Sequence, residues 1–174
     1  MIEMNVVHPF KPVIDEHSRV LILGSFPSVR SRETGFYYGH PQNRFWIVLS
    51  AIFQEKTPVG NDEKKAFLLR HHLALWDVLS SCEITGSSDA SIKNAIPNAL
   101  SSLIKQSQIT TIITNGNTSF TLFDRFNRPD ASLKVIRLPS TSAANAAMTS
   151  ERLIRIWREA LKDLLEDTSG EPSK

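Results

Sequence analysis

The chain has 174 residues, of which 41% are hydrophobic and 22% are charged, and its formal net charge is +2. This length suits one domain with a proper core, no stretch approaches the roughly 18 apolar residues of a membrane span, and the start lacks a secretory signal, so we expect a cytoplasmic protein. The single cysteine excludes an internal disulfide and a cysteine-rich metal site.

The charges are distributed unevenly along the chain. Residues 163–174 hold four acids and one base, so residues 1–162 carry 19 bases against 14 acids. The moderate excess of basic residues in this range is compatible with binding to nucleic acid but does not require it. We expect one domain over residues 1–166 and a polar, frayed tail over residues 167–174.

Short apolar runs alternate with segments of helical period along the chain. The expected elements are strands at Val20–Gly24, Leu73–Val78, Ile109–Thr114 and Lys134–Leu138, and helices at Arg44–Phe53, Asp62–Arg70, Pro97–Gln106, Thr118–Phe126 and Thr149–Leu165. Strands separated by helices imply parallel pairing through right-handed crossovers. We therefore predict an α/β fold, a three-layer α/β/α sandwich around a central, mainly parallel four-stranded sheet.

Polar turns follow three of the expected strands. They are Gly24–Ser28, Asn115–Asn117 and Pro139–Asn145. Gly, Pro, Ser and Asn also build ordinary turns, so each turn alone has a purely structural interpretation. Ligands of open parallel sheets bind beyond the carboxyl ends of the strands, and three polar turns at that edge favour one shared site.

Several common kinds of site are missing from the sequence. No segment matches a phosphate-binding glycine loop, the Gly-x-Ser-x-Gly pattern of a hydrolase is absent, and no His, Asp or Glu cluster has metal-ligand spacing. The sequence therefore predicts neither a nucleotide cofactor nor a metal ion.

The most distinctive segment is the aromatic run GFYYGHPQNRFW at residues 35–46. Aromatic side chains followed by an Asn-Arg pair at the start of a helix suit a pocket for a flat polar ring. We interpret this ring as a nucleobase.

Five segments together carry a resemblance to a known family. In chain order they are GSFPS, FYYGHPQNRFW, LWDVLSSCE, ITNG and LPSTSAANA, between about residues 20 and 160. They resemble the mismatch-specific branch of the uracil-DNA glycosylase superfamily and, within it, the hypoxanthine-DNA (deoxyinosine) glycosylase group.

The resemblance implies a DNA repair enzyme that flips a deaminated base, hypoxanthine first and uracil second, into the pocket and hydrolyses its N-glycosidic bond. Such an enzyme stabilises an oxocarbenium-like sugar and an anionic leaving base. No lysine lies in the five segments, which favours a monofunctional hydrolase without lyase chemistry, and we expect no cofactor. The implied partner is single- or double-stranded DNA, and we expect a monomer that does not bind membranes.

One position departs from the mismatch-specific relatives. Their first motif reads Gly-Ile-Asn-Pro-Gly, with the Asn orienting the attacking water, whereas this chain has Phe26 there. The hypoxanthine group shares this feature, and the resemblance implies that Asn43 takes over. An amide can both donate and accept hydrogen bonds. Asn43 could equally cap the following helix, a role worth about 1 kcal/mol.

Further roles follow for the pocket. Asn115 could read the Watson–Crick edge of the base or assist catalysis, or it could simply form an Asn-Gly turn. The resemblance implies that Tyr38 stacks on the flipped base, while Phe36 and Tyr37 are assigned to packing. Backbone N–H groups near Gly24, Ser25 and Phe26 are candidates to bind the base oxygen or the leaving anion.

The segment Pro139–Asn145 resembles the second motif of the superfamily, whose loop grips DNA beside the lesion. The DNA-binding candidates are Ser140, Thr141, Ser142 and Asn145, together with Arg30, Arg32 and Arg44, although a single surface arginine is more often only solvated. His40 could act electrostatically or belong to a turn, and Asp77 is interpreted as a turn cap.

Two alternatives to a DNA glycosylase stay open. Phe26 in place of the usual Asn is compatible with a lesion-binding module without turnover. Hydrolysis of free nucleosides is the other alternative, because a nucleobase pocket would serve it as well.

Overall fold

The computed structural model describes residues 3–127 and 131–169. Its strands are β1 (Glu3–Val7), β2 (Val20–Gly24), β3 (Leu73–Asp77), β4 (Leu79–Thr85), β5 (Lys93–Pro97), β6 (Thr111–Asn115) and β7 (Lys134–Leu138). Its helices are α1 (Val29–Thr34), α2 (Phe45–Phe53), α3 (Asn61–Arg70), α4 (Leu100–Lys105), α5 (Asn117–Phe126) and α6 (Ser150–Ser169), with a short 3₁₀ turn at Asp89–Ser91.

The central sheet has the strand order β3-β2-β6-β7, and all its neighbouring pairs are parallel. This confirms the predicted four-stranded parallel sheet. Every residue of β2 is buried, as expected for a central strand that is covered on both faces.

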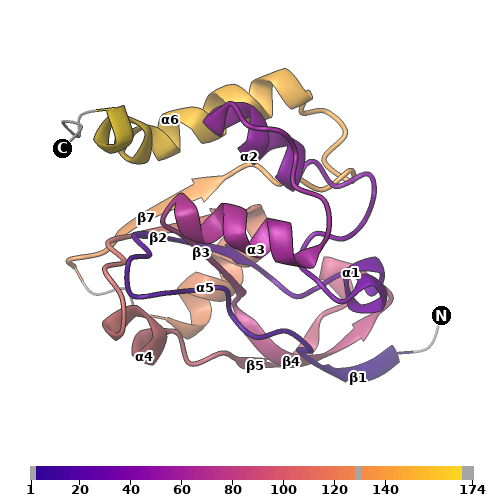
Figure 1. The fold of residues 1–174 in the computed structure, drawn as a ribbon. Coiled ribbons are helices and arrows are strands. Elements are labelled where there is room, and N and C mark those ends of the chain that lie inside the picture. Colours follow the sequence, from indigo (N-terminus) through magenta and orange to yellow (C-terminus); the bar gives the residue numbers. More distant parts are fainter. Residues whose placement is uncertain (1–2, 128–130, 170–174) are drawn as a thin grey trace.

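Two hydrophobic cores lie on opposite faces of this sheet. Val20 and Ile22 of β2 join the core under α2, α3 and α6, while Leu21 and Leu23 join the core that includes residues of α4, α5 and β4. Successive side chains of a strand point to opposite faces, which explains the alternation. Figure 1 shows the sheet between these two groups of elements, which confirms the three-layer α/β/α arrangement.

A second sheet, which the sequence analysis did not predict, completes the fold. It is antiparallel with the order β1-β4-β5. Its outer strands are largely exposed, so they lack the apolar signal of the central strands. The expected helix at Pro97–Gln106 is correspondingly shorter, because Pro97 closes β5 and α4 begins at Leu100.

The last helix, expected at Thr149–Leu165, is amphipathic. Its buried face is formed by Leu153, Trp157, Leu161 and Leu164. The side-chain oxygen of Thr149 accepts a hydrogen bond from the N–H of Arg152 at 3.2 Å and so caps the start of the helix. The helix continues to Ser169, three residues into the expected tail, and residues 170–174 lie outside the described residues.

Among the described helices, none is both long and apolar enough to cross a membrane.

Candidate active site

The carboxyl ends of the central strands meet beside a pocket of about 400 Å³. Gly24 at the end of β2 is in register with Asp77 at the end of β3, and Asn115 at the end of β6 pairs with Leu138 of β7. This is the edge where the polar turns predict a ligand site. Gly116, with φ of 97°, lets the loop after β7 approach, since an added Cβ would lie 3.0 Å from Ser140 Cβ.

The pocket brings together most of the residues singled out from the sequence. Its walls include Gly24, Ser25 and Phe26 after β2, Tyr38 and Asn43 from the aromatic run, Asn115 after β6, and Ser140, Thr141 and Ser142 after β7. Three predicted DNA contacts, Arg30, Arg44 and Asn145, do not line it.

One threonine joins the two predicted asparagines. The Thr141 hydroxyl donates to Asn43 Oδ1 at 2.9 Å and accepts from Asn115 Nδ2 at 3.1 Å. The Thr141 N–H also donates to Asn115 Oδ1 at 3.1 Å. Thr141 is fully buried, so this network holds two polar side chains at fixed positions in the pocket wall.

The hydrogen bonds of this network determine which atom of the Asn43 amide can bind a ligand. Asn43 Oδ1 also accepts from the N–H of Phe45 at 3.0 Å, so both its lone pairs are occupied. Among the described residues none bonds to Asn43 Nδ2, which leaves this group as a hydrogen-bond donor to the pocket. The N-cap of α2 is Arg44, so Asn43 is not the cap as expected; its bond to the Phe45 N–H instead closes a turn before the helix and is compatible with a donor role in the pocket.

The hydroxyl of Thr141 allows a matched test of this network. Thr141→Val should lower the free energy of unfolding by about 1–3 kcal/mol, because it leaves buried partners of the hydroxyl unsatisfied. Thr114 is the control, since it is also fully buried but its hydroxyl has no hydrogen-bond partner among the described residues. Thr114→Val should be neutral or stabilising. Urea titrations measure the free energy of unfolding of both variants. Equal losses in both variants would contradict a special role for the Thr141 hydroxyl.

Arg44 anchors the loop after β7. Its guanidinium donates to the carbonyl oxygens of Met148, Ser142 (3.2 Å) and Asn145 (3.1 Å). Both terminal nitrogens thus bind the loop after β7, while Nε is buried without a hydrogen-bond partner among the described residues, and a phosphate contact by Arg44 stays a prediction. Asn145 serves the same loop by donating from Nδ2 to the Ser140 carbonyl at 3.1 Å.

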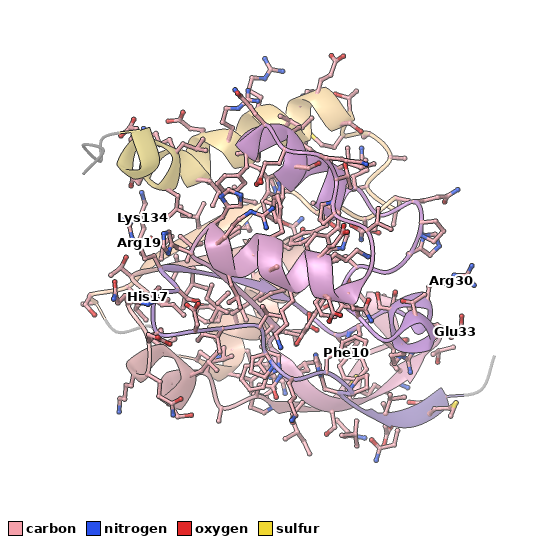
Figure 2. All side chains as sticks on the ribbon, in the orientation of Figure 1. Phe10, His17, Arg19, Arg30, Glu33 and Lys134 are labelled. Carbon is pink, nitrogen blue, oxygen red and sulfur yellow. The ribbon has the colours of Figure 1, made fainter. Side chains whose placement is uncertain are left out.

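Arg30 lies on α1, away from the pocket wall. Figure 2 shows its side chain extending outward beside Glu33, to which it is paired at 3.6 Å. Both side chains are more than half exposed, so the pair adds little stability and the guanidinium can exchange partners. Arg32 instead donates to the Gly86 carbonyl at 3.1 Å.

The aromatic run supplies one wall of the pocket. One face of Tyr38 stacks on Phe45, with centroids 4.1 Å apart and an interplanar angle of 22°. Tyr37 is buried and donates its hydroxyl to the Lys11 carbonyl at 2.8 Å, which agrees with the packing role expected for it. His40 is exposed, and its Nδ1 accepts from the N–H of Gln42 at 3.1 Å, as in a local turn.

Sequence reasoning missed a buried acid–imidazole pair beside the pocket. Asp77 was expected to cap a turn, but its Oδ2 lies 2.7 Å from Nε2 of His8, 69 residues earlier in the chain. That expectation is wrong, because the side chain points to a partner that is remote in sequence. Asp77 could have been noticed as a polar residue ending an apolar strand, whereas no local signal marks His8.

A second acid of the pocket was also missed. Asp89 accepts a hydrogen bond from the Ser25 hydroxyl at 3.0 Å. Desolvation raises the pKa of the Asp89 carboxyl, the bond from Ser25 opposes this, and the charge of Asp77 raises the pKa further. Burial likewise raises the pKa of the Tyr38 phenol, with Asp77 adding to the effect, so Tyr38 stays a neutral hydrogen-bond donor.

Among the described residues, no three His, Cys, Asp or Glu side chains are placed to hold a metal ion.

The chain is similar to known proteins along most of its length. Residues 11–163 match the Uracil DNA glycosylase superfamily. A hypoxanthine DNA glycosylase of Methanosarcina acetivorans is 33% identical over 145 residues, which cover 82% of this chain and 90% of that protein. A hypoxanthine DNA glycosylase of Methanosarcina barkeri is 40% identical over 95 residues, which cover 54% of this chain and 60% of that protein.

A solved structure shares the fold. The solution NMR structure of a proposed uracil DNA glycosylase from Methanosarcina acetivorans has a TM-score of 0.77 and 28% identity, covering 92% of this chain and 99% of that one. The five sequence segments, the strand-end pocket and these matches agree with one another. The chain therefore belongs to the uracil DNA glycosylase superfamily, whose members are DNA glycosylases that hydrolyse the N-glycosidic bond between base and sugar.

Proposed function

We propose that this DNA glycosylase removes hypoxanthine, and secondarily uracil, from DNA. The observation that carries the proposal is the pair of amides, Asn43 and Asn115, that Thr141 holds in the wall of the strand-end pocket. Fixed polar groups of this kind can recognise a flipped base and stabilise charge as it develops. The names of the two curated relatives support hypoxanthine as the first substrate to test.

The pocket geometry suggests how the work is divided. The ring of Tyr38, supported from behind by Phe45, would stack on the flipped base. Asn43 Nδ2 would donate to the attacking water or to the leaving base, and the turn at Ser25 and Phe26 would place backbone N–H groups near the base oxygen. Asn115 would read the base or hold Asn43 in place through Thr141.

The same proposal includes how DNA is held. The hydroxyls of Ser140 and Ser142 lie on the loop that Arg44 anchors, and we assign them to phosphates beside the lesion. Arg30 remains the exposed cation proposed to approach the DNA backbone. Action as a monomer, on single- or double-stranded DNA in the cytoplasm, is part of this proposal.

Single-turnover assays test the substrate. Oligonucleotides that contain one deoxyinosine or one deoxyuridine are incubated with excess protein, and abasic sites are cleaved with alkali. Release of hypoxanthine faster than uracil is expected. Absence of abasic product from both lesions would refute the proposed function, and equally fast release from free inosine would favour a nucleoside hydrolase.

Phe26 favours one alternative, a lesion-binding module without turnover. Its side chain is only 8% exposed and packs edge-on against His8, at 5.9 Å between centroids, so it does not offer the polar group expected at this position. Retained affinity for inosine-containing DNA without abasic product would support this alternative.

Tyr38→Ala should weaken binding to every accepted lesion by roughly tenfold, because stacking on an aromatic is worth about 1–3 kcal/mol per base. Tyr38→Phe isolates the contribution of the ring, since it keeps stacking and removes only the hydroxyl, and it should lose less affinity than Tyr38→Ala. Equilibrium binding to DNA with an uncleavable inosine analogue measures both variants. Unchanged affinity in Tyr38→Ala would show that Tyr38 only packs on Phe45.

A further inference from the structure

We propose that Asp77 accepts a hydrogen bond from the ring N–H of the flipped base, with His8 as the residue that positions it. Asp77 would then be the residue that distinguishes a deaminated base from its parent. The inference rests on the proposed function, because it concerns the same pocket and the same substrates.

The two carboxylate oxygens of Asp77 have different surroundings. Oδ2 is taken by Nε2 of His8, and the two side chains are only 5% and 3% exposed. Oδ1 would lie 2.4 Å from a Cβ added to Gly24, and no hydrogen bond joins it to any described residue. Asp77 belongs to the pocket wall, so this oxygen is a buried acceptor available to a ligand.

His8 is held firmly enough to keep Asp77 in this orientation. Its Nδ1 lies 2.9 Å from the carbonyl oxygen and 3.1 Å from the amide nitrogen of Phe10. Its ring also contacts the rings of Phe10, Phe26 and Tyr37, with centroids 5.6–5.9 Å apart. Phe26, which replaces the usual motif asparagine, thus helps to fix the partner of Asp77.

The polar groups near Gly24 are those of a binding surface. The Tyr38 hydroxyl would lie 3.0 Å from the same added Cβ, and it is buried without a hydrogen-bond partner among the described residues. Asp77 Oδ1, an acceptor, and the Tyr38 hydroxyl, a donor, therefore lie beside the same glycine. A ligand with complementary polar atoms would satisfy them.

Depth in the pocket indicates which part of the substrate Asp77 meets. The sugar of a flipped nucleotide stays attached to the DNA backbone at the pocket mouth, and the attacking water must reach that sugar. The Watson–Crick edge of the base lies on the far side of the ring and enters first. A carboxylate that is almost fully buried is therefore placed for the base edge.

The chemistry of the available oxygen, Oδ1, then selects between bases. An ionised carboxylate only accepts hydrogen bonds. Hypoxanthine at N1 and uracil at N3 carry a hydrogen, whereas their parents, adenine at N1 and cytosine at N3, present a lone pair that the carboxylate repels. Adenine and cytosine are therefore disfavoured, because their ring lone pair would face the carboxylate with no hydrogen between the two acceptors. Guanine and thymine also carry this hydrogen, so Asp77 does not exclude them.

Two substrates and one isosteric variant test the inference. Single-turnover rates are measured on DNA with deoxyinosine or deoxynebularine, a purine that has a lone pair at N1 and no exocyclic group. Asp77→Asn should lower the inosine-to-nebularine rate ratio at least tenfold, because the amide can donate to N1. The intrinsic lability of each glycosidic bond cancels when the ratio is compared between wild type and variant.

Controls separate the possible failures. The ratio is independent of the active fraction, and Asp89→Asn, the other carboxylate of this pocket, should leave it unchanged. An equal loss on both substrates in Asp77→Asn would overturn the inference. If Asp77→Asn does not fold, as judged by the lack of a thermal unfolding transition, His8→Gln is used instead, because it keeps the Asp77 carboxylate but loosens its position. An unchanged inosine-to-nebularine ratio in His8→Gln would also overturn the inference. An inactive wild type would instead refute the proposed function.

Discussion

Asn43→Ala is expected to slow base release in single-turnover assays by roughly tenfold or more while leaving lesion binding largely intact, because it removes a fixed donor from the pocket. Its Nδ2 is the group that no described residue occupies. The variant should also lose about 1 kcal/mol of stability, since the N–H of Phe45 loses its acceptor. Rates at saturating protein and urea titrations measure the two effects separately.

Asn43→Asp makes this prediction sharper. Aspartate keeps an oxygen for Phe45 N–H and Thr141 Oγ1, so stability should stay near that of the wild type, but the Nδ2 donor is gone. We expect the rate to fall as in Asn43→Ala. Asn5→Asp, on the exposed strand β1, is the matched control for the added charge. A near-normal rate in Asn43→Asp would contradict the donor role and leave Asn43 with the structural bonds of its Oδ1 to Phe45 and Thr141.

Phe45→Ala is expected to destabilise the protein by about 3–5 kcal/mol, as large-to-small replacements of buried aromatic residues do. Phe45 is fully buried and packs edge-on against Trp46 and Trp157, at 4.9 and 6.2 Å between centroids. It also supports the ring of Tyr38. We therefore expect weaker lesion binding together with a lower unfolding midpoint in urea.

Phe45→Leu separates packing from support of the stacking ring. Leucine fills much of the space but offers no flat face to Tyr38. It should cost less stability than Phe45→Ala while still reducing affinity for DNA with an uncleavable inosine analogue. Wild-type affinity in Phe45→Leu would show that Tyr38 does not depend on Phe45 for its position.

The central sheet could be predicted because its signal is local. The buried run at Val20–Gly24 and the period of α6 are each visible within a few residues. The rule that parallel strands place their carboxyl ends together then brings Gly24 and Asn115 to one edge. By contrast, β1 and β5 are mostly exposed, and β1 pairs with β4 from Glu3↔Thr85 to Val7↔Ser81, so their signal is weak and non-local.

Side-chain partners were less predictable than backbone elements. Arg44 was expected at a phosphate, but it lies within hydrogen-bond distance of carbonyls about a hundred residues away. Asp77 was expected to cap a turn, but it meets His8. An arginine or an aspartate has many suitable partners, and only the folded chain selects one of them.

Fold class, family and the edge of the sheet where the site lies were all predictable from the amino-acid sequence, because strand periodicity and contiguous motifs are short-range properties of the chain. Which polar atoms of the pocket are already hydrogen-bonded could be read only from the folded structure. Thr141 occupies the oxygen of Asn43, and His8 occupies one oxygen of Asp77. Hydrogen bonds act over about 3 Å, so which donors and acceptors remain available depends on segments that meet only after folding.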